Sequence, residues 1–158
     1  MAESIIRTLL SGGDRRGIAR SREARALVEA APKLVEQLVQ LASDDDWLVA
    51  MRALDLLEKL AQDRPDWIEP HKRVFLGAAA DSERWEMHLQ VVRALPLFRW
   101  NDAEMQRVLQ ILRRDARHPQ KFVRAWAVDG LSKLAREMPS LRPFVLGLAE
   151  EFEQSGSK

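Results

Sequence analysis

The side chains best able to do chemistry in this sequence are three histidines and a short run of aspartates. His71, His88 and His118 lie far apart along the chain, and no two stand at the spacing that places metal ligands on one helix. The three aspartates at 44–46 lack the glycine and the distant glutamate of a calcium loop. These patterns therefore predict no metal site and no cofactor.

Nucleophilic and phosphate chemistry also lack their usual residues. The chain contains no cysteine, which excludes disulfides, cysteine-ligated zinc and thiol catalysis. It has no glycine-rich phosphate loop, no nucleophile elbow and no paired carboxylates in a defined environment. We therefore expect a protein that is not an enzyme.

The composition is that of a soluble helical domain with a charged surface. The chain has 158 residues, 46% of them hydrophobic and 31% charged, and its formal net charge is +1. This length fits a single domain, residues 1–158. No stretch resembles a signal peptide or a membrane-spanning helix, so we expect a cytoplasmic protein with no membrane partner. A near-neutral chain attracts nucleic acid only through a local patch.

A repeat organises the chain around these polar residues. The segments 47–60, 85–98 and 121–134 align without gaps. Apolar residues coincide at four columns whose offsets of four, four and three place them on one face of a helix. The columns are Val49/Met87/Val123, Ala53/Val91/Ala127, Leu57/Leu95/Leu131 and Leu60/Phe98/Leu134.

A second helical pattern precedes each copy, at 32–42, 67–80 and 102–115. A weaker copy begins the chain, with Gly12 and Gly13 as the stop of its first helix. Asp46, Ser82, Asn101 and Ser140 are expected helix N-caps. The patterns predict helix pairs at approximately 3–31, 32–62, 66–98 and 102–137, and a last helix at 141–153.

The run Val-Arg-x-x-Ala-x-x-x-Leu at 123–131 resembles the second helix of a HEAT or armadillo-type repeat. The resemblance covers nearly the whole chain. It implies an all-α fold, a right-handed α-α solenoid (HEAT-like superhelix) of about four helix pairs plus a terminal helix. It also implies that the second helices line a concave face, where such solenoids bind extended partners.

The residues expected on that face lie beside the apolar stripe of the second helices. Their charges are mixed, which suits a protein surface better than a phosphate track. We therefore predict a protein–protein interaction scaffold whose partner is a protein or peptide. The candidate binding residues are Arg52, Asp55, Lys59, Arg84, His88, Gln90, Arg124, Trp126 and Asp129.

Trp126 departs from the repeat, because polar residues, Arg52 and Gln90, occupy its column in the other copies. It is expected either to serve as an exposed binding anchor or to pack beneath the last helix near Phe144. The cation-rich stretch 113–124 is interpreted either as a phosphate- or acid-binding edge or as an ordinary solvated turn.

Nucleic-acid binding or DNA repair is the alternative function. The chain is similar in architecture to HEAT-like alkylpurine DNA glycosylases, whose grooves use tryptophan and aspartate, and Trp126, Asp129 and Arg124 are the matching residues here. Those enzymes are longer and have strongly basic grooves, which makes nucleic acid the less favoured partner. The last helix is expected to cap a monomer, with a dimer through that helix as the alternative.

Overall fold

The computed structural model describes residues 2–13 and 20–155, and every element within these ranges is helical. The α-helices are α1 (Ala2–Leu10), α2 (Ser21–Ala30), α3 (Val35–Leu41), α4 (Trp47–Asp63), α5 (Pro65–Ile68), α6 (Trp85–Ala94), α7 (Asp102–Asp115), α8 (Lys121–Glu137) and α9 (Arg142–Ser155). Short 3-10 helices lie between them: η1 (Pro32–Leu34), η2 (Glu69–Leu76), η3 (Ala78–Asp81), η4 (Leu95–Leu97) and η5 (Pro139–Leu141). The all-α prediction is therefore confirmed.

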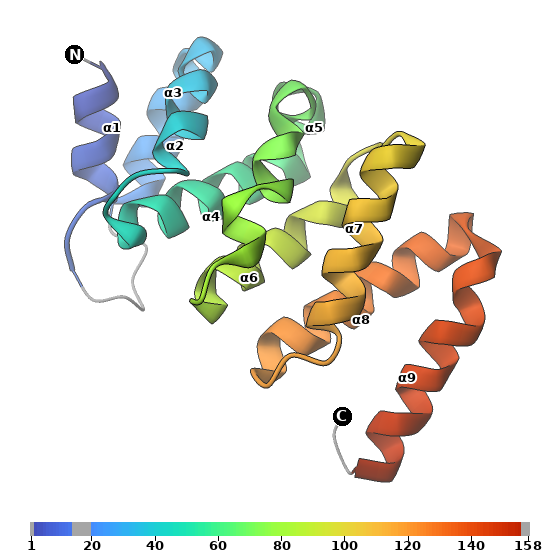
Figure 1. Cartoon of the computed structure of the whole chain (residues 1–158). Helices are drawn as coiled ribbons and strands as arrows, with labels where there is room; N and C mark the ends of the chain where they lie inside the picture. Colours follow the sequence, from blue (N-terminus) through green and yellow to red (C-terminus); the bar gives the residue numbers. More distant parts are fainter. Residues whose placement is uncertain (1, 14–19, 156–158) are drawn as a thin grey trace.

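The helices form two layers that follow the order of the chain (Figure 1). In one layer α2 packs against α4, α4 against α6, and α6 against α8. The other layer consists of α3, the segment from α5 to η3, and α7, and each of these packs against a helix of the first layer. Residues 49–58 of α4 are all buried in this arrangement, so α8 offers more exposed surface than α4.

The predicted apolar stripe of the three aligned segments forms the core between the layers. Every residue in its four columns is buried, from Val49 on α4 to Leu134 on α8. Full burial of one such aliphatic side chain contributes about 1.5–3 kcal/mol. On α4 and α6 the polar residues beside the stripe are buried as well, among them Arg52, Asp55 and Gln90, because neighbouring helices also pack against these two helices.

The first helix of the third pair differs from the prediction. A continuous helix over 67–80 was expected, whereas the structure has α5 followed by the 3-10 helices η2 and η3. Pro70 lies in the first turn of η2 and supplies no backbone N–H, and Gly77 separates η2 from η3. The segment still buries Ile68 and Phe75 against the core.

The second helix of the same pair is shorter than expected. The aligned pattern continues to Phe98, but α6 ends at Ala94 and the chain continues as η4. Pro96 explains this difference, since it lacks the N–H donor and its ring would clash with the carbonyl of Val92 in an α-helix. Both Leu95 and Phe98 nevertheless remain buried.

The two ends of the chain keep the expected helices. Gly12 and Gly13 follow α1 with φ of 78° and 75°, the left-handed conformation that ends helices, which confirms the predicted stop. Residues 14–19 of the predicted second helix lie outside the described residues. At the other end α9 packs against α8, and Leu146, one of its predicted apolar residues, is 64% exposed.

Candidate functional site

Four residues on three successive helices form the Arg93 cluster. Asp55 and Glu58 lie on α4, Arg93 on α6 and Trp126 on α8. Asp55 and Arg93 occupy equivalent positions in the aligned segments, so packing α4 against α6 brings them close together. The Arg93 side chain therefore connects both neighbouring helices of its layer.

Arg93 makes ionic and aromatic contacts with all three partners. Its Nη2 lies 3.2 Å from Glu58 Oε2, and its Nη1 lies 3.7 Å from Asp55 Oδ1. The guanidinium carbon lies 5.2 Å from the centre of the Trp126 ring, within the range of a cation–π interaction. One guanidinium thus bridges two carboxylates and an indole.

The two carboxylates are buried but incompletely hydrogen-bonded. Asp55 is 5% exposed and Glu58 is 1% exposed. Asp55 Oδ2, Glu58 Oε2 and Arg93 Nε have no hydrogen-bond partner among the described residues. Lys59 Nζ lies 2.9 Å from Asp55 Oδ2 and forms an ion pair without hydrogen-bond geometry. Buried carboxylates of this kind favour further cationic contacts.

Burial also changes the protonation of this cluster. Desolvation raises the pKa of the Glu58 carboxyl, and the nearby Arg93 charge opposes that shift. A hydrogen bond from Gln62 to Glu58 Oε1 acts in the same direction as Arg93. Glu58 is therefore a carboxylate whose charge depends on the cations that surround it.

Trp126 is 41% exposed, so the interpretation that places it beneath the last helix is wrong. Phe144 instead has the guanidinium groups of Arg113 and Arg117 over its ring, at 5.3 and 5.4 Å. Trp126 faces α6, because its position on α8 lies on the flank toward the preceding helix. Its indole is available at the outer surface.

Arg52 does not lie on an exposed surface, contrary to the prediction. It is fully buried, and its Nη1 donates to the carbonyl oxygens of Leu10 at 2.9 Å and Gly12 at 2.5 Å. These carbonyls end α1 and have no partner within that helix. Arg52 therefore binds α4 to the first helix pair and has a structural role.

Gln90 and Arg84 are also placed differently from the prediction. Gln90 is 5% exposed, so it cannot offer an accessible side chain. Arg84 is exposed, but it precedes α6 at the edge of the layer, where its guanidinium carbon lies 4.0 Å from the centre of the Trp47 ring. Neither residue belongs to the Arg93 cluster.

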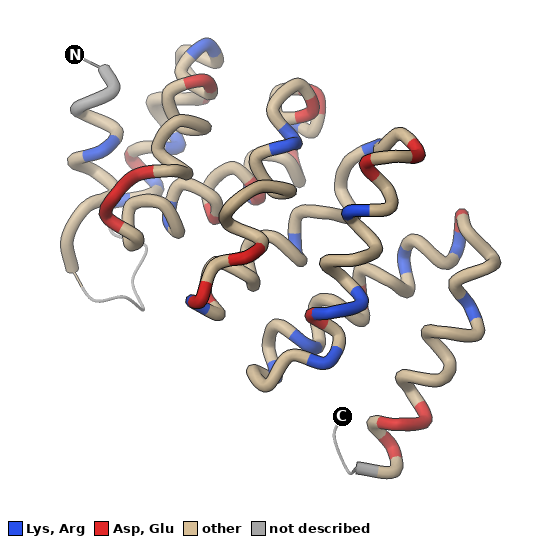
Figure 2. The backbone as a smooth tube through the Cα atoms, viewed as in Figure 1, with Lys and Arg blue, Asp and Glu red and all other residues tan. Residues whose placement is uncertain are grey.

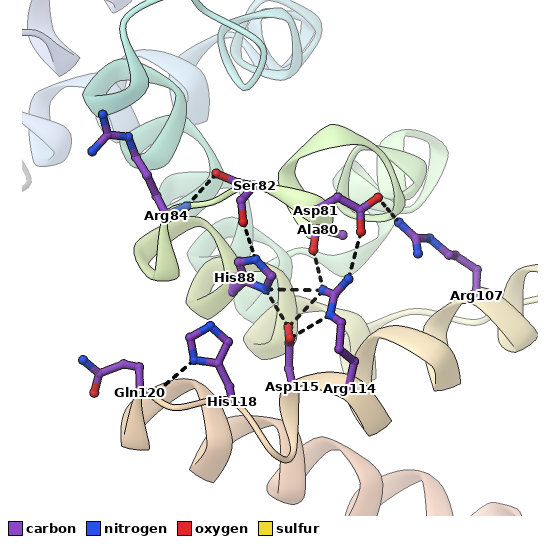
Figure 3. Close-up of polar contacts among 10 residues, drawn as sticks. All are labelled: Ala80, Asp81, Ser82, Arg84, His88, Arg107, Arg114, Asp115, His118 and Gln120. Carbon is purple, nitrogen blue, oxygen red and sulfur yellow. Dashed lines mark hydrogen bonds and ion pairs between the residues drawn. The ribbon is translucent and has the colours of Figure 1, made fainter.

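His88 lies in a buried polar network between η3 and the end of α7 (Figure 3). Its Nδ1 lies 2.9 Å from Asp115 Oδ2, and its Nε2 lies 2.6 Å from the carbonyl oxygen of Ser82. Arg114 donates to Asp81 Oδ1 at 2.8 Å and to Asp115 Oδ1 at 3.0 Å. The network joins the third helix pair to the fourth.

Nε2 of His88 faces the Ser82 carbonyl, and Nδ1 lies 2.9 Å from Asp115 Oδ2 and 3.3 Å from Arg114 Nη2. The protonated ring donates from both nitrogens, whereas the neutral ring can accept from Arg114 through Nδ1. The hydrogen bond to Asp115 raises the pKa of His88 above its usual value. In turn, the hydrogen bonds from His88 and Arg114 lower the pKa of Asp115 against the effect of burial. Because neither nitrogen is open to a substrate, His88 is not placed to act as a general base.

Three further candidates lie on α8 or at the margin of α4. Arg124 donates to the carbonyl oxygen of His118 at 3.0 Å and lies over the Phe152 ring, on the α9 side of α8. Asp129 pairs with Lys133 at 3.0 Å, and Lys59 pairs with Asp55 in the same i,i+4 geometry. Lys59 and Asp129 therefore flank the Arg93 cluster, whereas Arg124 faces away from it.

The cation-rich stretch 113–124 surrounds the turn between α7 and α8 (Figure 2). Its arginines have internal partners: Arg114 pairs with Asp81 and Asp115, and Arg117 pairs with Glu151 on α9 at 3.1 Å. These acids neutralise the charges of Arg114 and Arg117, and Arg124 donates to the carbonyl oxygen of His118. The interpretation of this stretch as a structural turn is the better supported one.

Glu58 and Arg93 are the site residues that the sequence interpretation missed. Arg93 occupies the same column as Asp55 and Asp129, so an alternation of acid, base and acid was present in the aligned segments. Glu58 gave no comparable signal, because Pro96 and Ser132 occupy its column in the other copies.

The described part of the chain holds no group of three or more histidine or acidic side chains that could bind a metal ion. Among the same residues, no helix is long and apolar enough to cross a membrane. No protein-family model, curated protein or solved structure matches this chain.

Proposed function

We propose that the chain is a short right-handed α-α solenoid of the HEAT-like type and acts as a non-enzymatic scaffold for a protein or peptide. The partner binds the exposed side of α8 beside α6, which belongs to the concave face in this proposal. The observation that carries the proposal is the exposed Trp126 beside buried, incompletely paired carboxylates. An exposed tryptophan next to polar groups is typical of interface anchors.

Nucleic-acid binding has weaker support. This alternative needs Trp126, Asp129 and Arg124 to lie on one face of α8. Arg124 instead faces α9 and donates to the carbonyl oxygen of His118. Arg93, the cation over the Trp126 ring, is already paired with the carboxylates of Asp55 and Glu58 and is therefore not free to bind a phosphate backbone. The surface around Trp126 therefore suits a protein better than a nucleic acid.

Photo-crosslinking in the native cells tests this proposal. p-Benzoylphenylalanine would replace the exposed Ala125, adjacent to Trp126 on α8, and the exposed Gln106 on α7 would be the matched control position. We expect discrete protein adducts from position 125, absent from position 106 and lost when Trp126→Ala is added. Equal labelling at both positions, no adduct, or adducts destroyed by nuclease would contradict the proposal.

A further inference from the structure

The Arg93 cluster has the arrangement of a guanidinium-binding site that is filled imperfectly. Two carboxylates on one helix face, Asp55 and Glu58, lie within reach of a single guanidinium, and an indole lies beside it. Planar guanidinium groups bind carboxylates through two parallel donors and stack on aromatic rings. The residues around Arg93 therefore match the chemistry of an arginine side chain.

Arg93 itself does not satisfy this site. Its distances to Glu58 and Asp55, 3.2 and 3.7 Å, exceed the usual charge-assisted spacing of about 2.7–2.9 Å. Its Nε is buried without an acceptor among the described residues. The side chain originates on α6, so its backbone position restricts how closely it approaches α4. An arginine arriving from outside would have no such restriction.

The acidic surroundings of the cluster favour an external cation. Within the cluster, Asp55 and Glu58 face two cations, Arg93 and Lys59, and Lys59 at the rim is 36% exposed. The segment 32–70 that contains them holds nine acids and four Lys or Arg residues. Trp126 is 41% exposed and the Arg93 side chain is 21% exposed, whereas Asp55 and Glu58 are 5% and 1% exposed, so an external cation reaches the two carboxylates only after Arg93 moves away.

We propose that the Arg93 cluster is the recognition site for an arginine side chain of the partner, which displaces Arg93 and binds Asp55, Glu58 and the Trp126 ring. This inference rests on the proposed scaffold function and specifies the partner as a peptide or protein segment bearing an exposed arginine. Arg93 occupies the site in the free protein and is released onto the surface when the partner binds.

Fluorine NMR of the full chain labelled with 5-fluorotryptophan tests this inference. The chain has five tryptophans, and Trp126→Phe identifies the Trp126 resonance. The probe is the acetylated and amidated tripeptide Gly-Arg-Gly, and the control replaces arginine with citrulline, a neutral isostere. We expect the arginine probe to shift the Trp126 resonance saturably and the citrulline probe to bind at least about tenfold more weakly.

Matched variants separate this site from a general charge effect. Asp55→Asn should weaken binding of the arginine probe by about tenfold, whereas Glu150→Gln, at an exposed position of α9, should leave it unchanged. Arg93→Gln empties the site and should tighten binding several-fold, which also provides a test if Asp55→Asn does not fold.

Three results would overturn the inference: no saturable shift with wild type and Arg93→Gln, equal binding of the citrulline probe, or equal weakening by Asp55→Asn and Glu150→Gln. If the partner crosslinks at position 125 but any of these three results is found, the scaffold proposal is still supported and only arginine recognition is contradicted. Loss of crosslinking with intact arginine binding would contradict the scaffold proposal instead.

Discussion

His88 donates a hydrogen bond to Asp115 across the junction of the third and fourth helix pairs, with 2.9 Å between Nδ1 and Oδ2. The second ring nitrogen donates to the carbonyl of Ser82, so the imidazolium joins α6 to both adjoining turns. Figure 3 shows Arg114 completing this contact from the other side of Asp115. The stability of the junction therefore depends on the charge of one histidine.

The first prediction concerns the pH dependence that His88 produces. Its folded pKa is raised above 6.5, so its stabilising effect is fully present below pH 6.5 and is lost as the pH rises through the folded pKa. His88→Gln should lower the free energy of unfolding by about 1–3 kcal/mol at acidic pH. The variant should also lack the decrease in stability that wild type shows as the pH rises. Urea denaturation over a range of pH measures both effects.

His118 provides the control for that experiment. Burial lowers its pKa, so protonation of His118 at low pH destabilises the fold, opposite in sign to the effect of His88. Below pH 6.5, His118→Gln should therefore be more stable relative to wild type than it is at higher pH. Identical pH profiles for the two variants would contradict the assignment of the imidazolium to His88.

The second prediction compares two glutamates with opposite pKa shifts. Burial raises the pKa of Glu58 above 4.5, so wild type should lose stability relative to Glu58→Gln as the pH rises from 4.5 through the folded pKa. Hydrogen bonds from Arg73 and the Asn101 backbone lower the pKa of Glu104, so its stabilising effect is present above pH 4.5 and lost as the pH falls.

Unfolding of Glu58→Gln and Glu104→Gln, each measured against wild type between about pH 4 and pH 8, checks these signs. The difference in free energy of unfolding between variant and wild type should rise with pH for one variant and fall with pH for the other. If both differences change in the same direction, burial does not control the Glu58 carboxyl.

The third prediction concerns Arg52. Arg52→Met keeps much of the side-chain volume but leaves the carbonyls of Leu10 and Gly12 without their donor. We expect a loss of about 2–4 kcal/mol in the free energy of unfolding and faster amide hydrogen exchange in α1. The control is Arg136→Met, at an exposed position of α8, which should change the free energy of unfolding by less than about 0.5 kcal/mol. Similar losses for both variants would rule out a structural role specific to Arg52.

The fourth prediction uses two glycines in helices. A methyl group at Gly130 of α8 would lie 3.3 Å from Leu112 Cδ2 and 3.3 Å from Pro96 Cγ, whereas no atom lies within 4 Å of the same group at Gly147 of α9. Gly147→Ala should therefore stabilise the protein by about 0.5–1 kcal/mol through helix propensity.

Gly130→Ala should destabilise the protein by about 1 kcal/mol, because the rigid Pro96 ring cannot move away and crowding exceeds the gain in propensity. Thermal unfolding of both variants tests the packing of α8 against η4 and α7. Equal stabilisation by the two substitutions would show that α8 packs less closely than described.

Much of the fold was predictable because local patterns express it directly. The spacing of apolar residues predicted α4, α7, α8 and the buried stripe, and Asp46 and Asn101 cap α4 and α7 as expected. Prolines explain the failures, since the apolar pattern continues through Pro70 and Pro96 while the backbone hydrogen bonding does not.

The candidate site was less predictable. Trp126 is exposed on α8, as the binding-anchor interpretation expects, whereas Asp55 was predicted on an accessible face and is 5% exposed because α6 packs alongside α4. Arg93 and Glu58 were missed because their importance arises from contacts between helices.

The sequence by itself determined the helices, their inward faces and the register of the repeat, because periodicity reports how one helix divides between apolar and polar sides. Only the tertiary structure decided that Arg52 is buried, that both His88 nitrogens are hydrogen-bonded, and that Arg93 bridges α4 to α8. These outcomes depend on which helix packs alongside and how far a long side chain reaches, and neither quantity is encoded in the periodicity of a single helix.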